Sequence, residues 1–235
     1  MATIEEPARI PQRMAIAGGL LALAAVLGAG LVAITEDATR ERIKSNEREY
    51  LLRSLNDVLP ADRYDNLLFE DTIQVTAAEL LGSDQPITVY RGRLGANPVA
   101  AILTPVAPDG YSGPIKLLVG IDYDGTLTGV RVVTHRETPG LGDAIEAERS
   151  DWIRGFDGLG LGNPPLSAWT VRRDGGYFDQ FTGATVTPRA VVKAVRSTLL
   201  YFSQHRDELF EKPQANAENE SGDDERDRPS GSVEE

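Results

Sequence analysis

The stretch DQFTGATVTP, residues 179–188, carries the most information about the fold of this chain and about its site. Its Thr-Gly-Ala-Thr core, which ends at Thr185, has the small residues of a tight turn. Thr187 is well placed to cap a following helix, with Pro188 at the first helical position. Apolar residues then recur at helical spacing. The sequence therefore predicts a turn that leads directly into a helix over Pro188–His205.

The predicted start of this helix is suited to an anion. A helix N-terminus presents unpaired N–H groups and the positive end of the helix dipole, which favour a bound phosphate. Gly183 and Ala184 let the backbone approach a ligand closely, and Thr185 offers a hydroxyl oxygen. A threonine hydroxyl is a weak nucleophile that needs outside activation. The turn alone is also compatible with a plain helix cap that binds no ligand.

Composition excludes most other cofactors. The 235-residue chain has no cysteine and two histidines, so iron–sulfur clusters, thiolate zinc and c-type haem are not expected, and we predict no metal site. An electron carrier built on this sequence needs an organic cofactor. The net charge of −12 and the lack of a basic stripe argue against nucleic acid. No Gly-x-Gly-x-x-Gly motif with a suitably placed acid is present, so we expect no NAD site.

The N-terminal part predicts one membrane span. Residues 14–34 carry no charge, and a helix of this length spans about 30 Å, the thickness of a bilayer core. A cleaved secretory signal is the alternative, although its apolar part is usually shorter. Arginine and lysine on the two sides of the span give no clear orientation. We favour a short cytoplasmic segment over residues 1–13, as in an uncleaved signal anchor.

The rest of the chain predicts a stalk, an α+β domain and a tail. Residues 35–59 favour a stalk helix that ends before Pro60. The domain is expected over residues 60–212, with an antiparallel sheet and helices. Residues 213–235 are acidic and nearly free of large apolar side chains, which is typical of a disordered tail. The expected strands are Ile87–Leu94, Val99–Thr104, Ile115–Ile121, Thr126–Thr134 (in a hairpin with the preceding strand) and Trp169–Arg173.

Four motifs occur in the order and at the spacing of a known family. They are DGYSGPIKLLVGID at residues 109–122, HRETPGLG at 135–142, WIRGF at 152–156 and DGGYFDQFTGATVTP at 174–188. From about Asp109 to Phe202 the chain resembles the G subunit of the Rnf ion-translocating electron-transport complex. The resemblance implies an FMN-binding domain with the FMN phosphate esterified to a threonine. The tail lies outside the resemblance.

The resemblance assigns roles to individual residues. Thr185 matches the threonine that carries FMN through a phosphoester, and a separate flavin transferase would attach it. The rest of the attachment signature corresponds to Asp179, Thr182, Gly183 and Ala184. The segment that faces the flavin corresponds to Glu137, Thr138, Gly140, Leu141 and Gly142, although a Pro-Gly type II turn without a ligand is an alternative interpretation of this segment. His135 is interpreted as a structural residue in preference to a hydrogen-bonding partner of the flavin, and Trp152 as a core residue in preference to one that stacks on the cofactor.

Family membership would also imply the reaction, the partners and the location. The Rnf complex moves electrons between ferredoxin and NAD and couples this transfer to ion movement across the membrane. This chain would be one electron relay in the bacterial inner membrane, with other membrane and iron–sulfur subunits as partners and no turnover of its own. The single span would place its FMN domain on the periplasmic side.

Two other functions remain open from the sequence. One is the C subunit of a sodium-translocating NADH:quinone reductase, which shares the Thr-Gly-Ala-Thr chemistry and the single span. The other is a membrane-anchored scaffold or ligand-binding domain with no redox role. The mass of the peptide that contains Thr185 distinguishes the last from both electron carriers.

Overall fold

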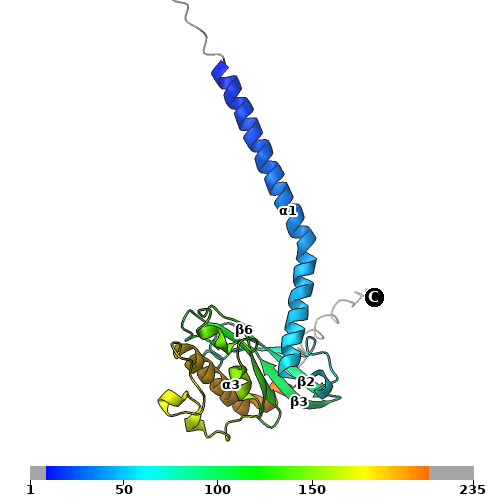
Figure 1. The fold of residues 1–235 in the computed structure, drawn as a ribbon. Coiled ribbons are helices and arrows are strands. Elements are labelled where there is room, and N and C mark those ends of the chain that lie inside the picture. Colours follow the sequence, from blue (N-terminus) through cyan, green and yellow to red (C-terminus); the bar gives the residue numbers. More distant parts are fainter. Residues whose placement is uncertain (1–8, 212–235) are drawn as a thin grey trace, which may run out of the picture. The chain divides into compact units, whose positions relative to one another are not determined.

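The computed structural model describes residues 9–211, which form two compact units, one up to Asn56 and one from Asp57 onward (Figure 1). The expected tail beyond residue 212 lies outside the described residues, as does the start of the N-terminal segment. In chain order the elements are α1 Arg9–Val58, η1 Ala61–Arg63, β1 Thr72–Val75, α2 Ala78–Leu81, β2 Ile87–Leu94, β3 Asn97–Leu103, β4 Val106–Ala107, β5 Ile115–Asp122, β6 Leu127–Thr134, η2 Gly142–Ile145, η3 Asp151–Phe156, η4 Leu166–Ala168, η5 Arg172–Asp174 and α3 Val186–Phe210.

Helix α1 contains the expected span and the expected stalk in one continuous element. Its Met14–Val32 segment is long and apolar enough to cross a membrane, by length and composition. Large apolar side chains of this segment are exposed to between half and three quarters, among them Leu20, Leu21 and Leu27. Exposed apolar side chains raise the free energy of a protein in water, because transfer of apolar surface out of water is favourable. In the hydrocarbon of a bilayer the same side chains carry no such penalty. Helix α1 ends two residues before Pro60.

An antiparallel sheet forms the centre of the second unit. The strands pair in the order β1-β2-β3-β5-β4, and β6 pairs with β5. Leu103 pairs with Val119 and Val106 with Lys116, so β3 and β4 follow one another along one edge of β5. The register of β5 and β6 places Gly120 opposite Gly129. The α+β class, with an antiparallel sheet and helices, is as the sequence predicted.

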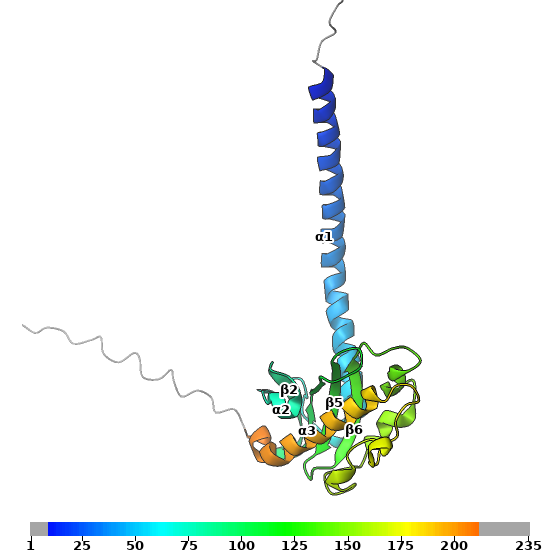
Figure 2. The ribbon, with the colours of Figure 1, turned by 90° about the vertical axis from the view of Figure 1, so that its left-hand side faces the viewer.

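Helix α3 covers one face of this sheet (Figure 2). Its buried side chains include Val191, Val195, Leu199 and Phe202, the same stripe that predicted a helix. These side chains belong to one apolar cluster with the inward residues of β2, β3, β5 and β6 and with the aromatic residues of the segment between β6 and α3. The N-terminus of α3 is thereby fixed against the segment that follows β6.

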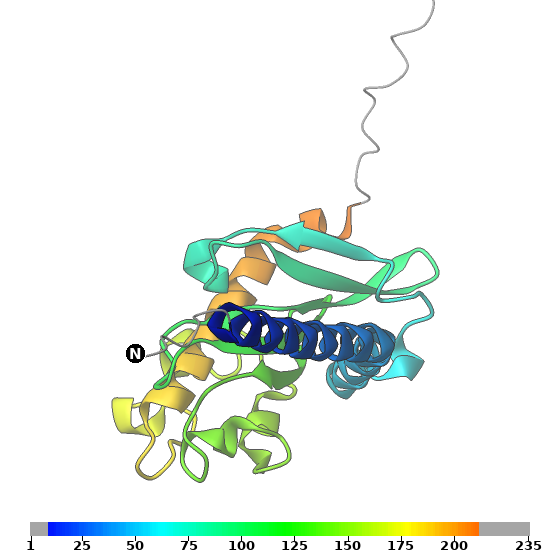
Figure 3. The ribbon, with the colours of Figure 1, turned by 90° about the horizontal axis from the view of Figure 1, so that it is seen from above.

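The C-terminus of α3 is held by two arginines of β2. Arg91 donates through Nη1 to the carbonyls of Leu209 (3.4 Å) and Glu211 (2.8 Å), and Arg93 donates through Nη2 to the carbonyl of Phe210 (2.8 Å). Both guanidinium groups also pair with the carboxylate of Asp71. Positive charge at the last carbonyls of a helix is favourable. Figure 3 shows α3 crossing the strands so that this end reaches β2.

The opposite face of the sheet is packed against the chain segment that enters the domain. Side chains alternate along a strand, so Gly120 faces away from its neighbours Val119 and Ile121, which lie in the α3-side cluster. A Cβ atom on Gly120 would lie 2.3 Å from Cγ1 of Val58 and 2.2 Å from Oγ1 of Thr128. The sheet therefore has no room for a side chain at the position where Val58 packs.

The structure corrects the sequence prediction in three places. The expected strand over Trp169–Arg173 is wrong, because this stretch follows the 3₁₀ turn η4, runs into the 3₁₀ turn η5 at Arg172 and makes only a single bridge, from Val171 to Phe178. The residue that precedes α3 is Thr185, so Thr187 is not its N-cap and lies inside the first turn. Helix α3 also continues past the expected end, as far as Phe210.

Candidate functional site

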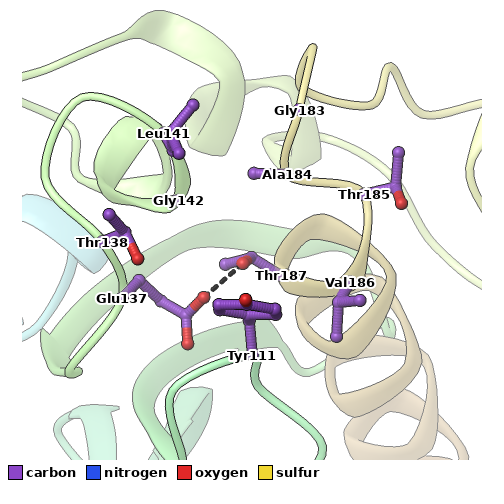
Figure 4. Close-up of a pocket in the computed structure, with 10 residues that line it drawn as sticks. All are labelled: Tyr111, Glu137, Thr138, Leu141, Gly142, Gly183, Ala184, Thr185, Val186 and Thr187. Atoms are coloured by element: carbon purple, nitrogen blue, oxygen red, sulfur yellow. Dashed lines mark hydrogen bonds between the residues drawn. The ribbon is translucent and has the colours of Figure 1, made fainter.

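Two segments that are far apart in the sequence, together with Tyr111 from the segment before β5, line one pocket (Figure 4). One is the loop after β6, and the other is the turn that enters α3. The pocket has a volume of about 350 Å³, within the range of small-molecule sites. Its lining consists of Tyr111, Glu137, Thr138, Leu141, Gly142, Gly183, Ala184, Thr185, Val186 and Thr187.

A buried carboxyl group joins the two segments at the base of the pocket. Glu137 is 4 % exposed, and its Oε2 accepts a short hydrogen bond from the hydroxyl of Thr187, which is fully buried in the first turn of α3. Its Oε1 accepts from the backbone N–H of Ser112 at 3.0 Å. These two bonds tie the loop after β6, helix α3 and the segment before β5 to one side chain.

The backbone of the loop is fixed by a histidine. The N–H of Glu137 donates to Nδ1 of His135 at 3.0 Å, so Nδ1 carries no proton. Nε2 of His135 then donates to the Glu146 carboxylate at 2.6 Å. His135 thus holds the loop in place, as expected of a structural residue.

The remainder of the loop is a tight turn over the pocket. The N–H of Leu141 and the N–H of Gly142 both donate to the carbonyl of Thr138, at 3.1 and 3.0 Å. Gly140 has φ +78°, as required at the third position of a type II turn. Gly140 does not line the pocket and serves the turn. Leu141 is 44 % exposed and projects over the pocket (Figure 4).

The second segment brings Thr185 to the margin of the pocket. Gly183 has φ +81°, and the N–H of Ala184 donates to the carbonyl of Phe181 at 3.2 Å, which closes the turn. Thr185 precedes the first helical residue, yet its side chain makes no capping hydrogen bond. Figure 4 shows this side chain pointing away from Glu137. The first N–H groups of α3 have no partners within the helix.

Besides Gly140, two more of the sequence-predicted residues lie away from the pocket lining. Asp179 pairs with Arg172 through Oδ1 and Nη1 at 2.8 Å, both side chains being 63 % exposed, and its carbonyl accepts from the indole N–H of Trp152. Thr182 is exposed and does not contribute to the lining. Trp152 packs edge-on against Phe156 and Phe181, in agreement with a structural role.

Sequence reasoning missed three residues that line the pocket. Tyr111 is 71 % exposed and lies in a motif that marked the resemblance without an assigned role. No motif points to Val186, and the sequence position of Thr187 indicates a helix cap. The hydroxyl of Thr187 reaches Glu137, a contact across fifty positions that no local pattern reveals.

Comparison with known proteins gives the class and then the family. Residues 110–200, which include the whole pocket lining, match the FMN-binding domain, and residues 1–58 match the RnfG N-terminal region. The chain is 50 % identical over 196 residues to the G subunit of the ion-translocating oxidoreductase complex of Pseudomonas aeruginosa (strain UCBPP-PA14), covering 83 % of this chain and 92 % of that protein. It is 46 % identical over 193 residues to the G subunit of the same complex in Pseudoalteromonas atlantica, covering 82 % and 90 %. The chain belongs to the family of G subunits of ion-translocating oxidoreductase complexes.

Proposed function

We propose that this protein relays electrons within its ion-translocating complex through an FMN that is attached by a phosphoester to Thr185. One observation carries the proposal: the Thr-Gly-Ala-Thr turn and the Glu-Thr-Pro-Gly-Leu-Gly loop line a single pocket, with Thr185 at its margin. FMN bound there supplies transfer of one or two electrons. The chain alone would catalyse no turnover and would depend on redox partners within the complex.

The residues present fit this cofactor. Gly183 and Ala184 are small, so the backbone of the turn can approach a ligand closely. The first N–H groups of α3 favour a phosphate group. The hydroxyl of Thr185 makes no capping hydrogen bond and is available as the esterified oxygen. Glu137, Thr138, Leu141 and Gly142 form the wall that faces the turn.

Asp179 and Thr182 have a different role from the residues that line the pocket. Both are exposed and lie outside the pocket lining, which suits recognition by the flavin transferase better than contact with bound FMN. Gly140 acts through the turn that positions Leu141.

The proposed setting is a bacterial inner membrane. The Met14–Val32 segment would cross it once, and the FMN domain would lie on the periplasmic side. The other membrane and iron–sulfur subunits of the complex would be the redox partners. The names of the relatives support membership of such a complex.

The attachment is tested on the full-length chain, co-expressed with the transferase. We expect a fluorescent band on a denaturing gel and an intact mass that exceeds the polypeptide by one FMN moiety. Thr185→Ala should remove both signals, and Thr126→Ala, a half-buried threonine outside the pocket, should keep both. A dark wild-type band would favour the non-redox scaffold.

The orientation is tested with single cysteines, which the cysteine-free chain makes specific. Ser167→Cys, on the exposed surface of the domain, should react with a membrane-impermeant maleimide in cells with a permeabilised outer membrane. Ala2→Cys should react only after the inner membrane is disrupted. The reverse pattern would place the domain in the cytoplasm.

A further inference from the structure

The pocket contains one carboxyl group, that of Glu137. The family resemblance assigns this residue to the segment that faces the flavin and gives it no further role. Of the ten lining residues, only Glu137 has an acidic side chain. It is 4 % exposed, whereas carboxylates are almost never fully buried unless they are paired. A buried charge beside a redox group changes the energy of that group.

Both oxygens of the Glu137 carboxyl group are held by hydrogen bonds. One accepts from the backbone N–H of Ser112 and the other from the hydroxyl of Thr187. The carboxyl also lies at the first turn of α3, where the helix dipole favours negative charge. Neither of these donors carries a formal charge.

Several cations near the pocket pair with acids other than Glu137, while Arg136, the preceding residue in the chain, has an exposed side chain. No ion pair found among residues 9–211 includes Glu137. On the same side of the fold the pairs are Arg149 with Asp143 and Glu146, Arg189 with Asp174, and Lys193 with Asp109. Glu137 thus lines the pocket without an ion-pair partner among the described residues.

We propose that the Glu137 carboxylate lowers the reduction potential of the flavin in this pocket, and that Thr187 is the positioning residue that holds the carboxylate there. The inference rests on the proposed function. Reduction adds two electrons to the flavin, taken from an external reductant, and protons follow from solvent. A fixed negative charge nearby opposes the incoming electrons, and water is too scarce at a buried group to screen it fully. The oxidised form is thereby favoured.

The measurement is a spectroelectrochemical titration of the full-length, FMN-loaded protein in detergent, with dithionite as the reductant. Glu137→Gln keeps the shape of the side chain, can still accept from Ser112 and can donate to the Thr187 oxygen. We expect a positive shift of its midpoint potential. Asp143→Asn is the matched control, because Asp143 is a buried acid of the same loop that does not line the pocket and lies near Arg149. Its shift should be smaller.

The outcomes separate this inference from the proposed function. A wild-type protein without covalent FMN contradicts the proposed function itself. Equal potentials in FMN-loaded wild type and Glu137→Gln, or a negative shift, overturn only the role of Glu137.

A second variant covers the case in which Glu137→Gln fails to fold. Thr187→Val removes one of the two hydrogen bonds that hold the carboxyl group at the pocket, so the carboxyl group is less firmly placed and the potential should move in the same direction by less. An unchanged potential in whichever variant folds overturns the inference.

Discussion

The two faces of the sheet are packed in different ways. On the face covered by α3, large side chains fill the space, and at the helix N-terminus a buried polar contact, Thr187 to Glu137, joins two segments. On the other face, Gly120 and Gly129 pair directly and leave the backbone bare beneath Val58. The first arrangement depends on which groups are present, and the second depends on the absence of side chains. Substitutions should therefore destabilise the two faces for different reasons, through added atoms on the glycine face and through a lost polar contact on the α3 face.

The largest effect is expected at Gly120. A methyl group there would lie 2.2 Å from Oγ1 of Thr128 and 2.3 Å from Cγ1 of Val58, so both neighbours must move. Overpacking a buried site costs about 1–3 kcal/mol, and a clash on two sides belongs at the upper end. We expect Gly120→Ala to lower the free energy of unfolding by about 3 kcal/mol in urea titrations of the purified protein.

Gly155→Ala is the matched control for this substitution. Nothing lies within 4 Å of the position that its Cβ would take, so its stability should stay near that of the wild type. Equal losses in Gly120→Ala and Gly155→Ala would show that the packing of Val58 against the sheet is not the cause.

A polar substitution should have the next largest effect, on the other face. Thr187→Val keeps the shape of the side chain but leaves Oε2 of Glu137 without its hydroxyl donor. An unsatisfied buried acceptor costs about 1–3 kcal/mol, and more when it is charged. We expect a loss of about 2 kcal/mol in the same urea titrations.

Thr198→Val offers a control on the same helix. Thr198 is also fully buried, but its hydroxyl donates at 2.8 Å to the carbonyl of Ala194 within α3. That carbonyl keeps its helical partner, so the loss should be under about 1 kcal/mol. If the two valine variants are equally stable, the contact between Thr187 and Glu137 contributes nothing beyond an ordinary hydroxyl bond.

A third substitution, at Gly129, tests how the loss of stability depends on the closeness of the contact with Val58. A Cβ on Gly129 would lie 3.3 Å from Cα and 3.4 Å from the carbonyl oxygen of Val58, tight but without overlap. We expect Gly129→Ala to cost less than about 1 kcal/mol, as for most substitutions that create no severe clash. A larger loss than in Gly120→Ala would reverse the proposed order of contacts beneath Val58.

The sequence predicted those parts of the fold whose causes are local. Alternating β-rich runs between glycine turns predicted the central strands, and the apolar stripe from Val191 to Phe202 predicted α3. The stretch Trp169–Arg173 has strand-forming residues but forms turns, because Trp169 packs against Phe156 and Phe178. That aromatic packing is a tertiary contact, and strand propensity depends strongly on such contacts.

The site shows the same division. The motifs located the Thr-Gly-Ala-Thr turn and the Glu-Thr-Pro-Gly-Leu-Gly loop, and the structure places both at one pocket. The role of Thr187 depends on a partner fifty positions earlier, so its position after the turn favoured the wrong interpretation as a cap. Tyr111 reaches the pocket from the segment before β5, which no periodicity connects with α3.

The smallest effect is expected at an ion pair beside the site. Arg189, in the first turn of α3, donates to both carboxylate oxygens of Asp174 at 2.6 and 2.9 Å. The hydrogen bond from Arg189 lowers the pKa of the Asp174 carboxyl below its usual value. A lowered pKa in the folded state adds stability at neutral pH that is lost as the pH falls through that pKa. Both groups are partly exposed, so solvent screens the pair.

Asp174→Asn should therefore melt slightly below the wild type at pH 7, and the difference should close below about pH 4, where the aspartate also becomes neutral. Thermal melts at several pH values measure this gap. Added salt should narrow it at pH 7, because screening weakens a partly exposed pair. The double variant Asp174→Asn with Arg189→Gln isolates the coupling, since removal of Arg189 should abolish the pH dependence of the gap. A gap that widens on acidification would mean that the charged Asp174 destabilises the protein, which would contradict a stabilising ion pair with Arg189.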